Sequence, residues 1–384
     1  PKPILILMHP LRSYLLPLTL GLTLAGCGPL LPESGGAAAA PVGQDGTPAE
    51  RSRAPAGDSV RFDYRFRDAG GQSHTVSFAL PAEAYAQARQ GLKPLQSDAV
   101  KGRLDRSVQR YAEDSSASWR EGMRARLQAL EGTLPDNIQL VYAFDGRQLS
   151  WSLKGRGVTQ AELERAGERL AQQIRRASAR LKQQQQRDVR AYAQDIRADL
   201  LAELNYVRDP DLGGLIRPDY AALAKRQADL LRPMARAVAA AAGTRDTRRQ
   251  VALALALMQE IPYDELRTRG ATDGTGFAVP AELLHVNQGD CDSKATALAS
   301  LLRTLAPGTA TAIVLLPGHA VLAADLPPQP GDRTLQLDGE RFVLMEPAGP
   351  ARIPLGQISE TSRDLLRDQG VDSLVWITGG PQGA

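Results

Sequence analysis

Four short stretches of the chain alternate apolar and polar residues with period two, and they occur in two pairs: 60–66 with 74–80, and 138–144 with 148–153. Turn-forming residues, Asp68–Gly71 and Asp145–Gly146, separate the members of each pair. Such alternation places one set of side chains on a buried face, and Asp and Gly permit the sharp reversal between strands. The pattern therefore predicts two β-hairpins, and the apolar spacing between them predicts helix over about Ala82–Glu131.

Farther along the chain, apolar residues recur at heptad-like steps and predict a long helix over Thr159–Val207. Thr159 precedes Glu162 by three residues, the spacing of a capping box, in which hydroxyl and carboxylate satisfy free amide groups. We expect this helix to pack on a neighbouring element; self-association as a coiled coil and binding of a partner are the alternatives. Pro210–Pro218 ends the helix, and Ala-rich amphipathic helices are expected to follow as far as Glu260.

The N-terminal residues have the pattern of an export signal. An apolar run from Tyr14 to Leu24 is followed by Ala25, Gly26 and Cys27. A run this short is typical of a signal-peptide core, because a membrane span needs about 20 apolar residues. Small residues directly before a cysteine resemble the lipobox of bacterial lipoproteins, which implies lipidation of Cys27 and removal of the leader. An ordinary secretory leader with an incidental cysteine is the alternative.

The residues after Cys27 indicate in which membrane the protein is anchored and how its folded body is attached. Gly28, rather than Asp, follows the cysteine. By the sorting rule of enteric bacteria this favours the outer membrane, with the protein facing the periplasm. Residues 28–57 are rich in Ala, Gly, Pro and Ser without apolar periodicity, so we expect a flexible tether between lipid anchor and folded body.

Length and composition indicate more than one folded unit. The chain has 384 residues, more than one average domain, and 43% hydrophobic residues are enough for a substantial core. The net charge of +3 comes without a compact basic patch interleaved with aromatics, so we expect no nucleic-acid partner. We expect an α+β protein in five parts: a signal peptide with lipobox (1–27), a tether (28–57), a β-hairpin and helix module (58–158), a long helical segment (159–216) and a C-terminal domain (217–384).

The two cysteines of the chain have different expected fates. Lipidation consumes Cys27, which leaves Cys291 without an intramolecular partner in a compartment that favours disulfides. Cys291 stands in Gly289–Lys294, just before an apolar helical pattern that ends near Leu305. Free amides and the dipole at a helix N-terminus favour an anion, so this placement is expected to stabilise the nucleophilic thiolate.

A nucleophilic thiol needs a base and a group that orients the base. His319 follows an apolar stretch and a Pro-Gly bend, which indicates a position at the start of a buried strand. Glu346 ends the next apolar strand and is the candidate for the orienting carboxylate, with Asp325 and Asp338 as substitutes. The backbone amide of Cys291 is a candidate oxyanion donor. A second donor, or another group lining the site, is expected among three residues: His285, Asn287 and Gln288.

These segments, in this order, resemble the transglutaminase-like superfamily, a circularly permuted relative of the papain fold. The resemblance covers about Thr244–Leu365. It is carried by five motifs: Gln259-Glu-Ile-Pro-Tyr263, Pro280-Ala-Glu-Leu, Gly289-Asp-Cys-Asp-Ser-Lys, Gly318-His-Ala-Val and Glu346-Pro-Ala-Gly. It implies a Cys291 nucleophile, a His319 base and a Glu346 acid. The chain departs from the family in having Glu where Asp is usual, Ala320 where an aromatic often follows the histidine, and no tryptophan near the site.

The resemblance implies acyl transfer. We expect a cysteine protease or amidase that acts on a protein or peptide in the cell envelope; a protein-crosslinking transglutaminase and a non-catalytic binding or assembly lipoprotein are the alternatives. Asp290 and Asp292 flank the nucleophile and are weak candidates for binding Ca²⁺, but two acids do not specify a Ca²⁺ site and are expected to cap the helix. The sequence contains no zinc spacing, Walker loop or dinucleotide fingerprint, so we expect no cofactor.

Overall fold

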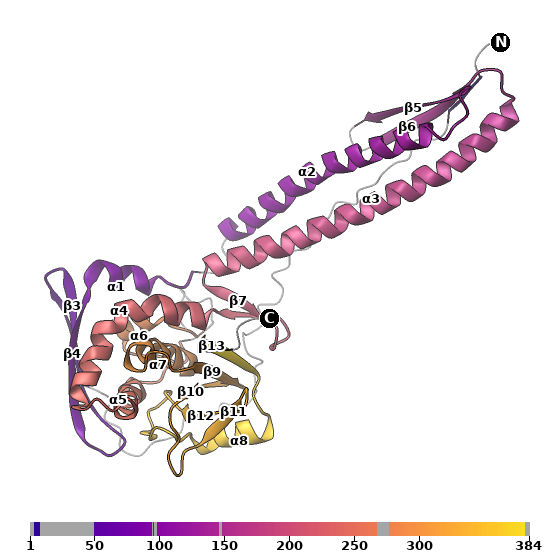
Figure 1. Ribbon diagram of the computed structural model, residues 1–384. Helices are drawn as coiled ribbons and strands as arrows, with labels where there is room; N and C mark the ends of the chain where they lie inside the picture. Colours follow the sequence, from indigo (N-terminus) through magenta and orange to yellow (C-terminus); the bar gives the residue numbers. More distant parts are fainter. Residues whose placement is uncertain are drawn as a thin grey trace. The chain divides into compact units, whose positions relative to one another are not determined.

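The computed structural model describes residues 4–7, 50–93, 95, 98–145, 148–266 and 276–380. Helices and strands both make up large parts of this range, so the α+β class expected from the sequence is confirmed (Figure 1). The chain divides into two compact units, one formed by Pro1–Thr23 with Ser97–Leu200 and the other by Leu24–Gln96 with Leu201–Ala384. Cys27 and the expected tether as far as residue 49 lie outside the described residues.

The first of these, which we call the inserted unit, consists of two long helices and a small antiparallel sheet of strand order β1-β6-β5. Its elements are β1 (Ile4–Leu7), α2 (Asp98–Glu131), β5 (Ile138–Asp145), β6 (Gln148–Gly155) and α3 (Gln160–Glu203). The alternating apolar residues of β5 and β6 face the helices. They form a core with residues that include Trp119, Met123, Leu140, Trp151 and Leu163.

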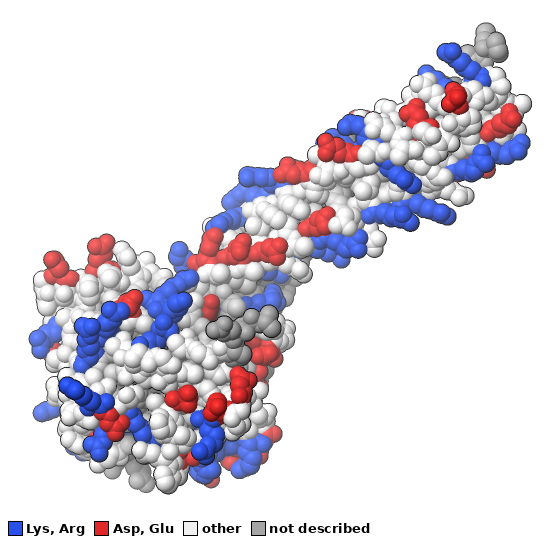
Figure 2. Space-filling model, viewed as in Figure 1, with Lys and Arg blue, Asp and Glu red and all other residues white. Residues whose placement is uncertain are grey.

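The long helix α3 begins and packs as its sequence predicts. The Thr159 amide donates a hydrogen bond of 2.8 Å to Glu162 Oε2, and the Glu162 amide donates to Thr159 Oγ1 at 3.3 Å, so the capping box is confirmed. The rings of Tyr111 on α2 and Tyr192 on α3 stack at 4.1 Å. The apolar face of α3 is thus covered by α2 of the same chain, and the exposed surface carries charged side chains of both signs (Figure 2).

The second unit, which we call the main unit, has three layers in which helices separate two antiparallel sheets (Figure 1). One outer layer is the sheet β2-β3-β4, and the other is a five-stranded sheet of order β11-β12-β10-β9-β13. Their elements are β2 (Glu50–Ala56), β3 (Ser59–Arg67), β4 (Ser73–Pro81), β9 (Thr311–Leu316), β10 (His319–Ala324), β11 (Thr334–Leu337), β12 (Glu340–Met345) and β13 (Ser373–Thr378).

The helical layer carries the centre of the main unit. Its members are α1 (Ala82–Arg89), α4 (Tyr220–Ala241), α5 (Thr247–Glu260), α6 (Pro280–Val286) and α7 (Cys291–Leu305). Helix α4 packs on β4, α5 packs on β3, and α7 packs on β9 and β10, so a continuous apolar core joins both sheets to the helices. Helix α8 (Glu360–Asp368) packs against the opposite face of the five-stranded sheet.

The hairpin β7 (Tyr206–Asp209) and β8 (Leu215–Pro218) follows α3 and belongs to the main unit. Arg217 Nε donates to buried Asp209 Oδ2 at 2.6 Å, and Ser373 Oγ of β13 donates to the same oxygen at 2.9 Å. The hairpin is thereby fixed to the edge of the five-stranded sheet. None of the described helices is both long and apolar enough to cross a membrane.

The structure differs from the sequence-based division of the chain at three points. Glu50–Ala56, expected as the end of the tether, forms β2, because its backbone pairs with β3. The expected helix over Ala82–Glu131 is interrupted after Arg89, and its two parts, α1 and α2, fall in different units. The expected module 58–158 is therefore split, since its first hairpin covers the helices of the main unit and its second belongs to the inserted unit. The long helix ends at Glu203, because Asn205 adopts a left-handed conformation with φ 66° before β7.

Candidate active site

Cys291 is the first residue of α7, as the sequence predicts. Asp290 is the N-cap of this helix, and its carboxylate oxygen accepts a hydrogen bond of 3.1 Å from the Ser293 amide. Gly289 packs closely on α6, since a Cβ at this position would lie 2.7 Å from Leu283 Cδ1. The thiol itself is largely covered, because Cys291 is only 8% exposed.

The three proposed catalytic residues come from adjacent elements of the main unit. His319 begins β10, which packs on α7, and the backbone amide of the next residue, Ala320, is one of the groups that act to lower the pKa of the Cys291 thiol. His319 Nε2 lies 3.0 Å from Glu346 Oε1, at the end of the neighbouring strand β12. The structure therefore brings the base and the acid into direct contact and places the start of the histidine strand against the thiol.

Glu346 is buried, at 3% exposure, among hydrogen-bond donors. Besides His319, its carboxylate accepts hydrogen bonds from the Ser359 amide at 2.7 Å, from Ser359 Oγ at 3.1 Å and from Ser362 Oγ at 3.0 Å. Burial alone would raise the pKa of Glu346, but these donors, His319 foremost, hold the pKa below its usual value. Glu346 is thus an ionised hydrogen-bond acceptor. It makes the contact with His319 for which Asp325 and Asp338 were the alternative candidates.

The electrostatic surroundings of the thiol differ from the expectation for a bare helix N-terminus. Burial, followed by the carboxyl groups of Asp292 and Asp290, raises the pKa of Cys291 well above its usual value. Hydrogen bonds from the backbone amides of Ala320 and Asp292 act in the opposite direction but are outweighed. Desolvation and the two nearby acids therefore oppose the stabilisation of the thiolate that is expected from the helix N-terminus.

The two acids beside Cys291 are engaged by the protein. Asp292 Oδ2 accepts a hydrogen bond of 2.6 Å from the Tyr220 hydroxyl, and Asp292 Oδ1 accepts one of 3.0 Å from the Ser293 amide. Burial, followed by the adjacent Asp292, raises the pKa of Asp290 well above its usual value, which favours its protonated form. Among the described residues no group of three or more His, Cys, Asp or Glu is arranged to hold a metal ion.

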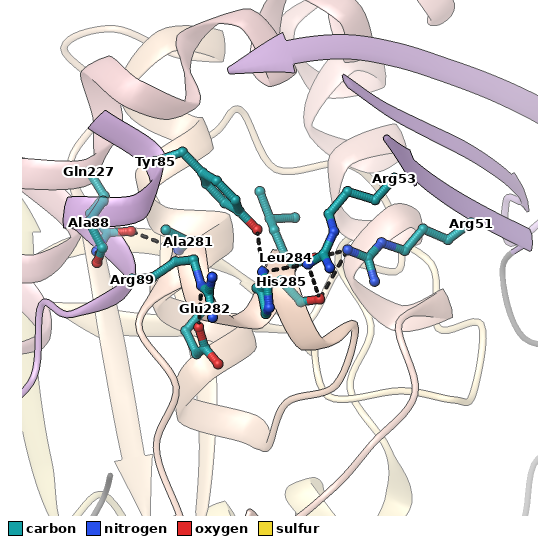
Figure 3. Close-up of polar contacts among 10 residues, drawn as sticks. All are labelled: Arg51, Arg53, Tyr85, Ala88, Arg89, Gln227, Ala281, Glu282, Leu284 and His285. Carbon is teal, nitrogen blue, oxygen red and sulfur yellow. Dashed lines mark hydrogen bonds and ion pairs between the residues drawn. The ribbon is translucent and has the colours of Figure 1, made fainter. Parts of the chain in front are cut away.

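The three residues considered for the oxyanion hole lie in α6 and the connection to α7. The His285 side chain is directed to α1 and to the sheet β2-β3-β4. There Arg53 Nη1 contacts its Nδ1, and the Tyr85 hydroxyl lies 3.2 Å from the same atom (Figure 3). Burial and the neighbouring arginines lower the pKa of His285, so its ring is neutral. Asn287 is the left-handed C-cap of α6, with φ 55°, and Gln288 follows it. His285 is therefore a structural contact at the end of α6.

The arginines of β2 hold the same helix end. Arg51 Nη2 donates to the carbonyl oxygens of Leu284 and His285, at 2.5 and 3.1 Å, and Arg53 Nη1 donates to the His285 carbonyl at 2.9 Å (Figure 3). Carbonyl groups at a helix C-terminus lack partners within the helix and carry partial negative charge, so two guanidinium groups stabilise this end. Strand β2 thus fixes the helix that leads into the Cys291 segment.

Tyr263 is a residue of the site to which the sequence analysis assigned no role. It forms a parallel β-bridge with Gly289, in which the Gly289 amide donates to the Pro262 carbonyl at 3.2 Å. Burial, followed by the nearby thiol of Cys291 and the acids around it, raises the pKa of Tyr263, so its phenol stays protonated. Its place in the Gln259–Tyr263 motif, upstream of the cysteine motif, was the available signal.

Comparison of the chain with protein-family models, with curated proteins and with solved structures gave no match.

Proposed function

We propose that the main unit is a thiol-dependent acyl-transfer enzyme, a cysteine protease or amidase with Cys291, His319 and Glu346 as its triad. The observation that carries this proposal is the 3.0 Å contact between His319 Nε2 and the buried Glu346 carboxylate, at the start of a strand that packs on the helix of Cys291. A histidine oriented by a buried carboxylate beside a cysteine at a helix start is the arrangement that nucleophilic catalysis requires.

The steps follow from the geometry of the ring. Because Glu346 occupies Nε2, Nδ1 of His319 is the nitrogen that takes the proton from the Cys291 thiol. The thiolate attacks the carbonyl carbon of an amide, and the charged oxygen accepts hydrogen bonds from donors at the start of α7. The C–N bond then breaks as His319 returns the proton to the leaving amine. Water activated by His319 hydrolyses the thioester and releases the carboxylic acid, which regenerates the thiol.

The donors for the charged oxygen are assigned from what surrounds the thiol. The Cys291 backbone amide is the first, because amides of the first helical turn have no partner within the helix. The Tyr263 hydroxyl is the second, since the Tyr263 backbone pairs with Gly289 and its raised pKa, to which the Cys291 thiol contributes, keeps the phenol protonated. His285 is not assigned as an oxyanion donor, because its ring contacts Arg53 and Tyr85.

The covered thiol favours one other class of function. Cys291 is 8% exposed and its pKa is raised, and both properties are expected of a domain that keeps the fold as a binding or assembly module. In the catalytic case the thiolate forms only as an ion pair with protonated His319. Thiol reactivity then depends on His319, whereas in the non-catalytic case it does not.

The test is alkylation of Cys291 in the full-length protein by a chloroacetamide probe at neutral pH, with the label located by peptide mass spectrometry. We expect faster labelling than in an unfolded peptide containing the same cysteine, and a loss of about 100-fold in His319→Ala. His74→Ala is the matched control, because His74 Nε2 forms a similar pair with Asp68 Oδ2, at 2.8 Å, in the first sheet. Equal rates for the wild type, His319→Ala and the peptide contradict the catalytic function.

We further propose that cleavage before Cys27 removes the leader, which includes β1, and that the mature protein is lipid-anchored through Cys27 in the bacterial cell envelope, at the outer membrane, with envelope proteins or peptides as its substrates. The support is the sequence Leu24-Ala-Gly-Cys27 after a short apolar run. Cys27→Ser is expected to move the protein from the membrane fraction to the soluble fraction. Unchanged fractionation, or a mature protein without a fatty acid by mass spectrometry, contradicts this assignment.

A further inference from the structure

Lys294 is a charged residue buried in the middle of the site. It lies three positions after Cys291 in the first turn of α7 and is 0% exposed. Its Nζ donates hydrogen bonds to two backbone carbonyls, that of Ile261 at 2.5 Å and that of Ala348. Lysine is almost never fully buried, because desolvation of the amine is costly. The burial of Lys294 therefore needs an explanation other than packing.

The two carbonyls belong to segments that lie far apart in the sequence. Ile261 directly follows α5, whereas Ala348 lies two residues after Glu346, in the segment that leaves β12. One side chain from the cysteine helix thus connects the end of α5 to the chain that carries the proposed acid.

A second buried side chain holds the same segment. Gln259 is 1% exposed, and its Nε2 donates to the carbonyls of Glu346 and Ile353, each at 2.9 Å. Gly349 has φ 62° and lies so close to the Gln259 backbone that any Cβ would overlap with its carbonyl oxygen. The chain over 346–353 is thereby held at its beginning, middle and end by residues from α5 and α7.

We propose that Lys294 is a positioning residue of the active site. Its buried amine ties the helix that carries Cys291 to the segment that carries Glu346, and so fixes the His319–Glu346 pair relative to the thiol. This inference rests on the proposed function, because it assigns Lys294 a part in keeping the triad assembled.

The donor count of the amine suits this role. Burial lowers the pKa of Lys294 to about 7, although the nearby Asp290, Cys291 and Glu260 favour the charged form. The ammonium has three N–H groups and the neutral amine has two, which equals the number of carbonyl partners. The connection therefore persists on both sides of neutral pH.

The test compares pH–rate profiles for alkylation of Cys291 in the full-length protein. Lys294→Met keeps an unbranched apolar side chain that is one atom shorter and removes the donors. We expect at least a tenfold slower reaction at pH 7 and a profile displaced toward that of Glu346→Gln. Ser300→Ala is the matched control on α7, because buried Ser300 Oγ donates only to the Thr296 carbonyl of its own helix, at 2.9 Å.

A second variant keeps the test decisive where Lys294→Met does not fold. Gln259→Leu removes the other two hydrogen bonds to the 346–353 segment and is expected to displace the profile in the same direction. A lower melting temperature with an unchanged profile in the folded variants means that Lys294 only stabilises the fold, which overturns the inference. If His319→Ala has the same pH–rate profile as the wild type, the proposed function is contradicted, and the positioning role of Lys294 is contradicted with it.

Discussion

Replacement of Glu346 by Gln tests whether the buried carboxylate holds the histidine as an anion. The side chain keeps its size, but one of its two oxygens becomes an NH₂ group. If Oε1 stays a carbonyl, contacts with His319 Nε2, Ser359 Oγ and Ser362 Oγ remain as neutral hydrogen bonds, whereas the Ser359 amide faces a second donor. Both ring orientation and local stability are then expected to suffer.

The size of the effect follows from these contacts. An unsatisfied buried amide costs about 1–3 kcal/mol, and each of the three remaining hydrogen bonds loses about 1 kcal/mol when its acceptor is no longer charged. Relief of the desolvation cost of a buried carboxylate offsets part of this loss. We expect Glu346→Gln to lower the free energy of unfolding of the main unit by about 2–4 kcal/mol at pH 7.

The pH dependence gives the effect a signature. The pKa of Glu346 is lowered in the folded state, so its contribution to stability is complete above the unfolded pKa, about 4.3, and is lost as the pH falls through the folded pKa. The gap in unfolding free energy between wild type and Glu346→Gln is therefore expected to be constant from pH 7 to about pH 5 and to shrink toward pH 3.

Urea unfolding followed by exposure of the Cys291 thiol measures this gap for the main unit alone. A pyridyl disulfide is a suitable reagent because it remains reactive in acid, and Cys291 is buried in the folded state. A gap that is absent at pH 7, or one that stays the same down to pH 3, refutes the assignment of Glu346 as an ionised acceptor for His319.

Three further substitutions probe other contacts. Asp290→Asn is expected to change the melting temperature and the rate of thiol labelling little, because burial and Asp292 favour the neutral form of Asp290 and Asn is a good N-cap; a loss above about 2 kcal/mol contradicts this reasoning. Gly349→Ala is expected to cost about 3 kcal/mol in thermal unfolding, since the position is left-handed and a Cβ overlaps with Gln259, and a near-neutral effect would mean that the segment moves freely. Thr159→Ala is expected to destabilise the start of α3 by about 1 kcal/mol, seen as faster hydrogen exchange in its first turn; unchanged exchange contradicts the capping box.

Features with a local cause could be predicted from the sequence. Alternating apolar residues place the strands of both hairpins, and the spacing of Thr159 and Glu162 places the start of α3. The order of motifs placed Cys291 at a helix start and brought His319 to Glu346, because His319 begins one short apolar strand and Glu346 follows the end of the antiparallel neighbour.

Features that depend on distant partners could not be predicted. Strand β2 has the composition of a linker, and it is ordered by pairing with β3 and by the contact of Arg51 with Leu284, 233 residues away in the chain. The raised pKa of Cys291 likewise depends on how deeply the thiol is covered, which no local pattern reveals. The burial of Lys294 also depends on the carbonyls of Ile261 and Ala348, which come from other segments of the chain.

The division of the main unit into two stretches of sequence has a consequence for how the protein is made. The apolar face of β3 and β4, including Phe62, Tyr64 and Phe78, is covered by α4 and α5, which are synthesised only after the whole inserted unit. Roughly 180 residues separate the end of β4 from the end of α5. At a synthesis rate of about 5–20 residues per second, the apolar face of β3 and β4 therefore stays exposed for about 10–40 s. The first sheet is thus the part of the nascent chain that a holding chaperone must shield, and chains truncated before α5 are expected to aggregate.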